Sequence, residues 1–280
     1  MIKRIIVAVI GLPLIFLILF HFPPIVLSIS IAIVCALIVY ELLHAVMPFK
    51  GNIRLFIYNM ISAATIPIGI FFGLSYIVIP AAFLALLSLA FLEAIIRFGT
   101  DRHYPISHIL LAFFAGLLIP YLISTLVVLR VMPHGRFLVL VPVICAFATD
   151  GGAYFVGVLF GKHKAFPHVS PNKTIEGCVG GIVVGTLALM VFGVIVNLTY
   201  LNFVNFWALL AYGLIGSVIC QLGDLAFSLI KREFKIKDFG SFLPGHGGAL
   251  DRFDSMIFTA PAIYLLVLLL PFFGILVLFR

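Results

Sequence analysis

Long apolar runs separated by short polar breaks dominate the sequence. Nine such runs can be delimited, at residues 5–20, 25–47, 55–74, 76–96, 108–130, 137–160, 177–199, 206–230 and 255–279. Each is long enough, or nearly so, to cross a hydrocarbon core about 30 Å thick as a helix. Because 64% of the residues are hydrophobic and only 10% are charged, a water-soluble globule would lack polar surface. We therefore expect an all-α, polytopic integral membrane protein.

Basic residues divide unevenly between the two sides that nine spans define. If the N-terminus is cytoplasmic, that side receives 14 of the 17 Lys and Arg residues, and only Arg130, Arg136 and Arg280 fall opposite. Lys and Arg collect on the cytoplasmic side of membrane proteins. We therefore expect a cytoplasmic N-terminus in the cytoplasmic (inner) membrane, and we attribute the net charge of +7 to orientation rather than to nucleic-acid binding. Merging the runs on either side of residues 72–75 would give eight spans and spoil this asymmetry.

The first apolar run follows Lys3-Arg4, as in a signal peptide. No small-x-small cleavage site follows the run, and Pro23-Pro24 leads directly into the next one. We therefore expect an uncleaved first helix.

Polar residues concentrate in the second half of the chain. We divide the chain into an N-terminal region of about five spans, residues 1–135, and a C-terminal catalytic region, residues 136–280. The second region contains two cytoplasmic loops, 161–176 and 231–254, which hold eight of the 17 basic residues. In the first region, Glu41 and Glu93 are interpreted as interfacial carboxylates that pair with Lys50 or Arg97.

Two carboxylates lie inside apolar runs: Asp150, followed by Gly151-Gly152, and Asp224. A carboxylate at such depth costs at least about 2.5 kcal/mol unless it faces a partner or water. Two of them near basic loops predict a polar cavity open to the cytoplasm, although structural ion pairing is an alternative. Gly151-Gly152 either allow close helix packing or loosen the helix where a ligand approaches.

Gly177, Gly181 and Gly185 recur at four-residue spacing within the seventh run. Small residues at this spacing allow membrane helices to pack closely. Packing is the expected role of these three glycines, and a homodimer formed through this helix is a further hypothesis.

The segment from Ser228 to Ser255, SLIKREFKIKDFGSFLPGHGGALDRFDS, combines three features. It carries five basic residues able to bind phosphates, and the glycine-rich turn at 244–248 has backbone N–H groups suited to an anion. Asp251 and Asp254 would share a helix face if the last span begins here. With Asp224 they would form a carboxylate site for Mg²⁺, which takes one or two carboxylates plus substrate phosphates. Together these features predict phosphoryl or nucleotidyl transfer.

This segment resembles the signature of the phosphatidate cytidylyltransferase family, S-x-x-K-R-x4-K-D-x-G-x2-L-P-x-H-G-G-x2-D-R-x-D, at all its polar positions. Ala249 departs from the family, which has a larger apolar residue there, so packing at this position differs. The stretches from Asp150 to Lys162 and from Ser170 to Gly177 are also similar to the family. In the N-terminal half only hydropathy, span count and Tyr40-Glu41-Leu42 agree with it.

The resemblance implies the reaction CTP + phosphatidate → CDP-diacylglycerol + pyrophosphate, with Mg²⁺ and a lipid substrate drawn from the bilayer. It implies metal ligands at Asp224, Asp251 and Asp254. It places phosphate-binding groups and further site residues at Lys162, Ser170, Lys173, Lys231, Arg232, Lys237, Asp238, His246, Gly247, Gly248 and Arg252. Lys173 and Ser170 would hold the second substrate's phosphate or the leaving group, and Asp150 would bind a second cation or orient Lys173.

Three alternatives remain at this stage. His246, between glycines, could serve only to order its turn by hydrogen bonding. Intramembrane aspartates also occur in secondary transporters, although these more often show internal repeats and a site at the midplane. A CTP-dependent enzyme acting on another lipid, such as a polyprenol kinase or an archaeal ether-lipid cytidylyltransferase, is a closer alternative.

Overall fold

The computed structural model describes residues 13–100, 103–199, 204–240 and 247–273. Within these residues, eight helical segments are long and apolar enough to cross a membrane: Pro24–His44, Ile53–Phe71, Ser75–Arg97, Ile106–Val131, Gly135–Phe160, Ile175–Thr199, Phe206–Glu233 and Leu250–Leu269. They correspond one to one to the second to ninth predicted runs. The first run lies partly outside the described residues, and its described part, residues 13–20, is helical. The protein is therefore an all-α polytopic integral membrane protein, as predicted.

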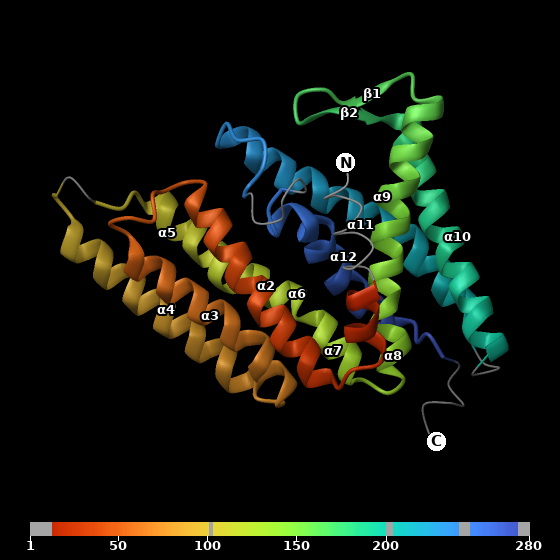
Figure 1. Cartoon of the computed structure of the whole chain (residues 1–280), viewed down its shortest axis with the longest axis horizontal. Coiled ribbons are helices and arrows are strands. Elements are labelled where there is room, and N and C mark those ends of the chain that lie inside the picture. The colour runs from red at the N-terminus through yellow and green to blue at the C-terminus, as the bar shows by residue number, and fades with distance from the viewer. Residues whose placement is uncertain (1–12, 101–102, 200–203, 241–246, 274–280) are drawn as a thin grey trace. The chain divides into compact units, whose positions relative to one another are not determined.

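The chain forms two compact units (Figure 1). Unit 1 comprises residues 1–128 and 234–252, and unit 2 comprises residues 129–233 and 253–280. The predicted loop 231–254 is therefore divided between the units: residues 234–252 belong to unit 1 with the N-terminal helices, and the rest belong to unit 2. The division of the chain at residue 135 into an N-terminal and a catalytic region stays a prediction.

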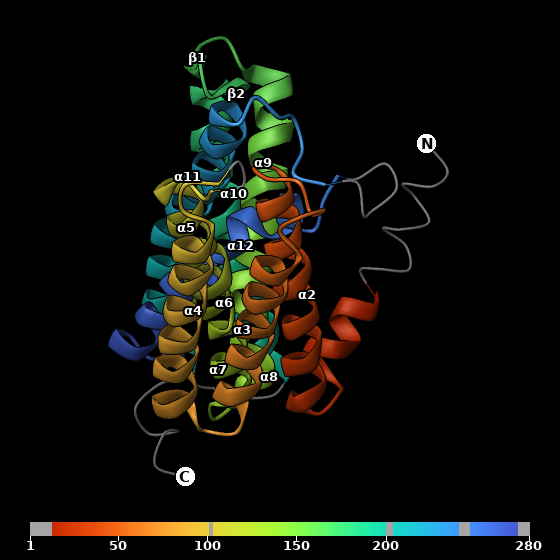
Figure 2. The same ribbon diagram turned by 90° about the vertical axis from the view of Figure 1, so that its left-hand side faces the viewer.

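Unit 1 is built on α2 (Pro24–His44), α3 (Ile53–Phe71) and α4 (Ser75–Arg97), which lie beside one another in that order (Figure 2). The next span contains α5 (Ile106–Phe113), the π-helical turn η1 (Phe114–Leu118), α6 (Ile119–Ile123) and α7 (Thr125–Val131). The π-turn ends two residues before Pro120, whose missing N–H cannot take part in the regular helical hydrogen bonding.

The break between α3 and α4 is a tight turn at Phe72-Gly73-Leu74. Gly73 adopts a φ of +70°, in the left-handed region that a residue with a Cβ rarely enters. The Cβ of a residue at position 69 would collide with Val78, so glycine is needed where the two helices meet. The two runs are therefore separate helices, which confirms the predicted break.

Unit 2 is built on α8 (Gly135–Leu138), α9 (Leu140–Phe160), α10 (Ile175–Thr199), α11 (Phe206–Glu233) and most of α12 (Leu250–Leu269). The predicted loop 161–176 contains an antiparallel hairpin, β1 (Lys164–Phe166) and β2 (Ser170–Thr174), at one end of α9 and α10 (Figure 1). An apolar core surrounds Tyr212, whose hydroxyl donates to the Leu270 carbonyl.

The glycines of α10 face its neighbours within unit 2. A Cβ at position 181 would lie 2.8 Å from the Thr149 carbonyl oxygen of α9, and one at position 177 would lie 2.8 Å from the Ala153 carbonyl oxygen. A Cβ at position 185 would collide with the hydroxyls of Thr149 and Ser217. The predicted packing role is therefore confirmed, but it is fulfilled inside one chain, so these glycines lend no support to the homodimer, which stays a prediction.

The outer face of α10 is apolar along its length. Leu187, Val191 and Leu198 are between 58% and 79% exposed. Such a continuous exposed apolar stripe would be costly in water, whereas acyl chains cover it in a bilayer.

The last span differs from its predicted limits of 255–279. Helix α12 begins five residues earlier, at Leu250, and ends at Leu269, shortly before Pro271. Asp251 and Asp254 therefore both lie in the first turns of a helix, as the i, i+3 interpretation requires.

Candidate functional site

Three carboxylates from three helices gather in unit 2: Asp150 of α9, Asp224 of α11 and Asp254 of α12. Their charges are close enough to repel one another. We call these three residues the carboxylate cluster. Asp254 is 8% exposed, Asp224 is half-buried and Asp150 is exposed. Because like charges held together are unfavourable, the cluster favours binding of a cation.

Lys173 supplies one positive charge to this cluster. It projects from β2, and its Nζ lies 2.6 Å from Asp224 Oδ2, with both side chains largely buried. Its charge also attracts that of Asp150. Of the two carboxylates near Lys173, Asp150 and Asp224, it is therefore Asp224 that forms the direct ion pair.

Ser255 links two members of the cluster and was not among the predicted site residues. Its Oγ lies 3.1 Å from Asp150 Oδ2 and 3.5 Å from Asp254 Oδ1, so its single hydroxyl proton can serve either carboxylate. Its position directly after the family motif was the only sequence signal for this role.

The hairpin that carries Lys173 is held by hydrogen bonds at both ends. Glu176, at the start of α10, accepts the backbone N–H groups of Lys162 and His163 at 3.1 and 3.2 Å, and its second oxygen lies 2.6 Å from His163 Nδ1. At the turn between the strands, Arg232 Nε of α11 donates to the Val169 carbonyl at 3.1 Å. Arg232, predicted to hold phosphate, therefore also anchors the hairpin.

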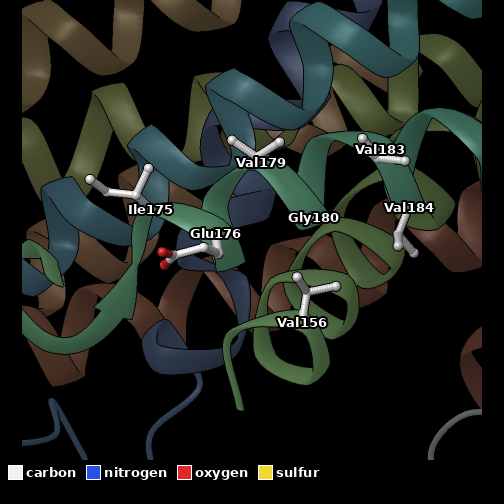
Figure 3. A pocket seen from close by; sticks show the side chains of 7 residues that line it. All are labelled: Val156, Ile175, Glu176, Val179, Gly180, Val183 and Val184. Carbon is white, nitrogen blue, oxygen red and sulfur yellow. The ribbon is translucent and has the colours of Figure 1, made fainter. Parts of the chain in front are cut away.

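An apolar groove runs between α9 and α10, with Glu176 at one end (Figure 3). Val156 of α9 points toward Gly180 of α10, where a Cβ would collide with it. The rest of the lining is aliphatic, from Ile175, Val179, Val183 and Val184. Residues of this kind suit contact with acyl chains.

The two glycines that follow Asp150 behave differently. A Cβ at position 152 would collide with Val184, so Gly152 permits close packing, whereas nothing lies within 4 Å of a Cβ at position 151. Helix α9 is continuous across both residues, so the glycines do not loosen it in this structure.

In unit 1, Asp251 accepts hydrogen bonds from the backbone, and its charge repels that of Glu41. Its Oδ2 accepts the N–H of Phe239 at 2.9 Å and that of Gly248 at 3.0 Å. The Gly248 N–H, predicted to face a phosphate, is therefore directed at Asp251. Gly247 has a φ of +81°, as expected in a tight turn.

The remaining predicted site residues fall into three groups. Lys162 and Arg232 of unit 2 are exposed, as are Lys237, Asp238 and Arg252 of unit 1. Ser170 and Lys231 are half-buried in unit 2. His246 lies outside the described residues, so its role stays a prediction.

Among the residues that the structure describes, no three His, Cys, Asp or Glu side chains converge as a ready-made metal-ion site. The donor set nevertheless fits Mg²⁺, which needs only one or two carboxylates beside water and phosphate oxygens. Asp224 and Asp254 supply such oxygens within unit 2. The assignment of metal ligands stays a prediction.

The two acidic residues of the first half have different partners. Glu93 pairs with Arg97, with Oε1 2.9 Å from Nε, and also lies 3.6 Å from Arg54, which confirms its predicted pairing with Arg97. Glu41 does not follow that interpretation, because its oxygens accept the backbone N–H groups of Ala249 and Leu250. The short Tyr40-Glu41-Leu42 match was the only sequence signal for this contact.

The sequence matches the profile described as the cytidylyltransferase family over residues 2–270. Several similar proteins carry the name phosphatidate cytidylyltransferase. The one from Bacillus subtilis (strain 168) is 46% identical over 126 residues, 45% of each chain. Those from Staphylococcus haemolyticus (strain JCSC1435) and Staphylococcus aureus (strain COL) are 46% and 45% identical over 136 and 139 residues, covering 48% of this chain and 50% of theirs. The chain thus spans about half the length of the curated relatives it matches.

Proposed function

Because the chain belongs to the cytidylyltransferase family, we propose that it catalyses CTP + phosphatidate → CDP-diacylglycerol + pyrophosphate. An oxygen of the phosphatidate phosphate forms a bond to the α-phosphorus of CTP. The bond from that phosphorus to the bridging oxygen breaks, and pyrophosphate leaves with the electron pair. The observation that carries the proposal is the carboxylate cluster with its Lys173 partner, in a chain of this family.

The reaction needs charge neutralisation more than proton transfer. The phosphatidate oxygen is already anionic at neutral pH, so no strong base is required. The main barrier is the approach of one anionic phosphate to another, which positioned cations lower. Lys173, on its anchored hairpin, is suited to bind a phosphate once Asp224 is neutralised by another cation.

Asp224 and Asp254 would hold Mg²⁺, and Asp150 would bind a second cation or help to position Lys173. When bound, Mg²⁺ would neutralise the charge that develops on pyrophosphate. Lys162, Ser170, Lys231 and Arg232 would bind phosphates from unit 2.

The motif residues of unit 1 also enter the proposal. Lys237 and Arg252 would bind phosphates beside the Gly247-Gly248 turn, and Asp238 and Asp251 belong to the same motif. The metal-ligand role of Asp251 rests on the family resemblance, since its contacts in the structure are to backbone N–H groups.

We further propose nine spans with a cytoplasmic N-terminus, in the cytoplasmic membrane. The 14-to-3 division of basic residues supports this orientation. It places the loops at 161–176 and 231–254 in the cytoplasm, where CTP is found. Phosphatidate could then keep its acyl chains in the bilayer, against aliphatic surfaces such as the groove between α9 and α10, while its headgroup reaches the carboxylate cluster.

The decisive test is to incubate the purified protein in detergent with phosphatidate, Mg²⁺ and CTP labelled at the α-phosphate with ³²P. Label should appear in lipid, and unlabelled pyrophosphate should be released. Transfer of label to lipid only from γ-labelled CTP would indicate a kinase and reject the proposal. Omitting phosphatidate and chelating Mg²⁺ provide the two controls.

A further inference from the structure

Glu41 is a buried carboxylate that contacts the motif loop from a distant part of the sequence. It lies in the last turn of α2 and is 4% exposed. Its Oε1 accepts the Ala249 N–H at 2.9 Å, and its Oε2 accepts the Leu250 N–H at 2.8 Å. These N–H groups stand at the start of α12, where a helix has no backbone acceptors of its own. One carboxylate of α2 therefore caps the helix that carries Asp251.

The loop backbone fits closely around this carboxylate. A Cβ added to Gly240 or to Gly248 would lie 2.7 Å from Glu41 Cδ, nearer than real Cβ atoms approach. Both glycines are fixed positions of the motif. Glycine is therefore required at both positions in this chain, because a larger residue would occupy the space of the Glu41 side chain.

Asp251 fixes the same loop from within. By accepting the N–H groups of Phe239 and Gly248 it joins two points nine residues apart, while Glu41 holds the next two N–H groups, at 249 and 250. We call Glu41 and Asp251, with these four N–H groups, the loop clamp. A buried carboxylate needs such partners to remain charged, and the positive end of a helix favours it.

We propose that Glu41 is a positioning residue for the motif loop: by anchoring residues 249 and 250 to α2, it sets the conformation in which Lys237 and Arg252 bind substrate phosphates. This inference rests on the proposed function. It assigns a role in phosphate binding to the N-terminal half of the chain, where the sequence showed little chemistry. Glu41 itself is not required to touch the substrate.

Glu41→Gln is the informative variant, because it keeps the size of the side chain but replaces one acceptor oxygen by an NH₂ group facing a backbone N–H. The matched control is Glu93→Gln, the same change at a buried glutamate (5% exposed) of unit 1 that forms ion pairs with Arg54 and Arg97. Both variants lose a buried charge, but only the first alters the loop clamp.

We expect Glu41→Gln to weaken Mg²⁺–CTP binding, measured calorimetrically without lipid, by about 10- to 100-fold, as for other residues that orient a site. kcat/KM for CTP should fall in parallel, and amide exchange should accelerate at residues 247–250. Glu93→Gln should keep wild-type CTP affinity even where its melting temperature drops. Glu41→Asp keeps the charge and should recover part of the affinity, and it replaces Glu41→Gln if that variant does not fold.

Wild-type CTP affinity in Glu41→Gln, or equal losses of affinity in Glu41→Gln and Glu93→Gln, would overturn the inference. If neither Glu41 variant folds while Glu93→Gln does, Glu41 is a folding determinant and the positioning role is rejected. Failure of the proposed function appears separately, as a wild-type protein that binds Mg²⁺–CTP but places no α-label in lipid.

Discussion

The carboxylate cluster of unit 2 and the loop clamp of unit 1 differ in what their carboxylates contact. In the carboxylate cluster, Asp150, Asp224 and Asp254 repel one another and are partly balanced by the ammonium of Lys173. In the loop clamp, Glu41 and Asp251 accept four backbone N–H groups. The carboxylate cluster therefore carries excess negative charge that a cation would neutralise, whereas the carboxylates of the loop clamp fix the conformation of the backbone that they contact.

This difference indicates how to tell a binding carboxylate from a structural one in an apolar chain. Burial alone does not separate them, because each group contains one buried carboxylate, Asp254 at 8% and Glu41 at 4% exposure, beside more exposed ones. Their partners differ in number: Asp254 of the cluster accepts one backbone N–H, whereas Glu41 and Asp251 accept two each, which offsets the repulsion between these two carboxylates. Five substitutions, grouped in four predictions, test this distinction and the packing that supports the carboxylate cluster.

Asp224→Asn should give the largest effect. Removing a proposed Mg²⁺ ligand and the partner of Lys173 should lower kcat by about 10³-fold, or about 4 kcal/mol of transition-state stabilisation. Label transfer from α-³²P-CTP to lipid measures it. Glu233→Gln, an exposed acid at the end of α11, is the control and should retain activity. Activity within threefold of wild type in Asp224→Asn would remove this residue from the site.

Lys173→Met should come next, with a loss of about 100-fold in kcat/KM, or about 2.7 kcal/mol. The side chain keeps its length but loses the charge that pairs with Asp224. Lys164→Met alters an exposed lysine of the same hairpin and should leave kcat/KM unchanged. Similar losses in the two variants would show that Lys173 acts only through hairpin stability or general charge.

Gly181→Val tests the packing that holds the helices of the cluster together. Its Cβ would press on the Thr149 carbonyl one residue before Asp150, so we expect the free energy of unfolding to fall by about 1–3 kcal/mol. Thermal unfolding in detergent measures this. Leu187→Val, on the exposed face of the same helix, should change it little. An unchanged melting temperature in Gly181→Val would contradict the close contact between α9 and α10.

Asp254→Asn and Asp251→Asn should change stability in opposite directions, each by about 1 kcal/mol. The first relieves repulsion from Asp150 and Asp224, so the melting temperature without divalent cations should rise. The second weakens hydrogen bonds that a carboxylate makes better than an amide, so it should fall. Thermal unfolding with a chelator present measures both. The same sign in both variants would remove the distinction between the cluster and the loop clamp.

Much of the candidate site was accessible from the sequence. Asp150 and Asp224 drew attention because a carboxylate inside an apolar run demands an explanation, and the motif supplied Lys173 and Asp254. The sequence did not reveal that Lys173 pairs with Asp224, or that Ser255 lies between Asp150 and Asp254. A serine among apolar residues is common, and nothing in its spacing marks it.

Glu41 and Gly248 show the opposite outcome. At the end of an apolar run, Glu41 looked like an interfacial acid, and Gly248 looked like part of a phosphate-binding turn. The structure gives Glu41 backbone partners more than 200 residues away and directs the Gly248 N–H to Asp251. Local sequence records neither contact, because backbone N–H groups are the same at every residue except proline.

Hydropathy, glycine spacing and the distribution of basic residues were sufficient to predict the membrane character of the chain, the eight described spans, the break at Gly73 and the helical packing of Gly181. These follow from the local cost of exposing polar backbone to hydrocarbon and from the size of single side chains. The grouping of three aspartates from α9, α11 and α12, and the capping of α12 by Glu41, depend on which helices pack together. That choice arises from the sum of many weak contacts between distant segments, so it could be seen only once the helices were assembled.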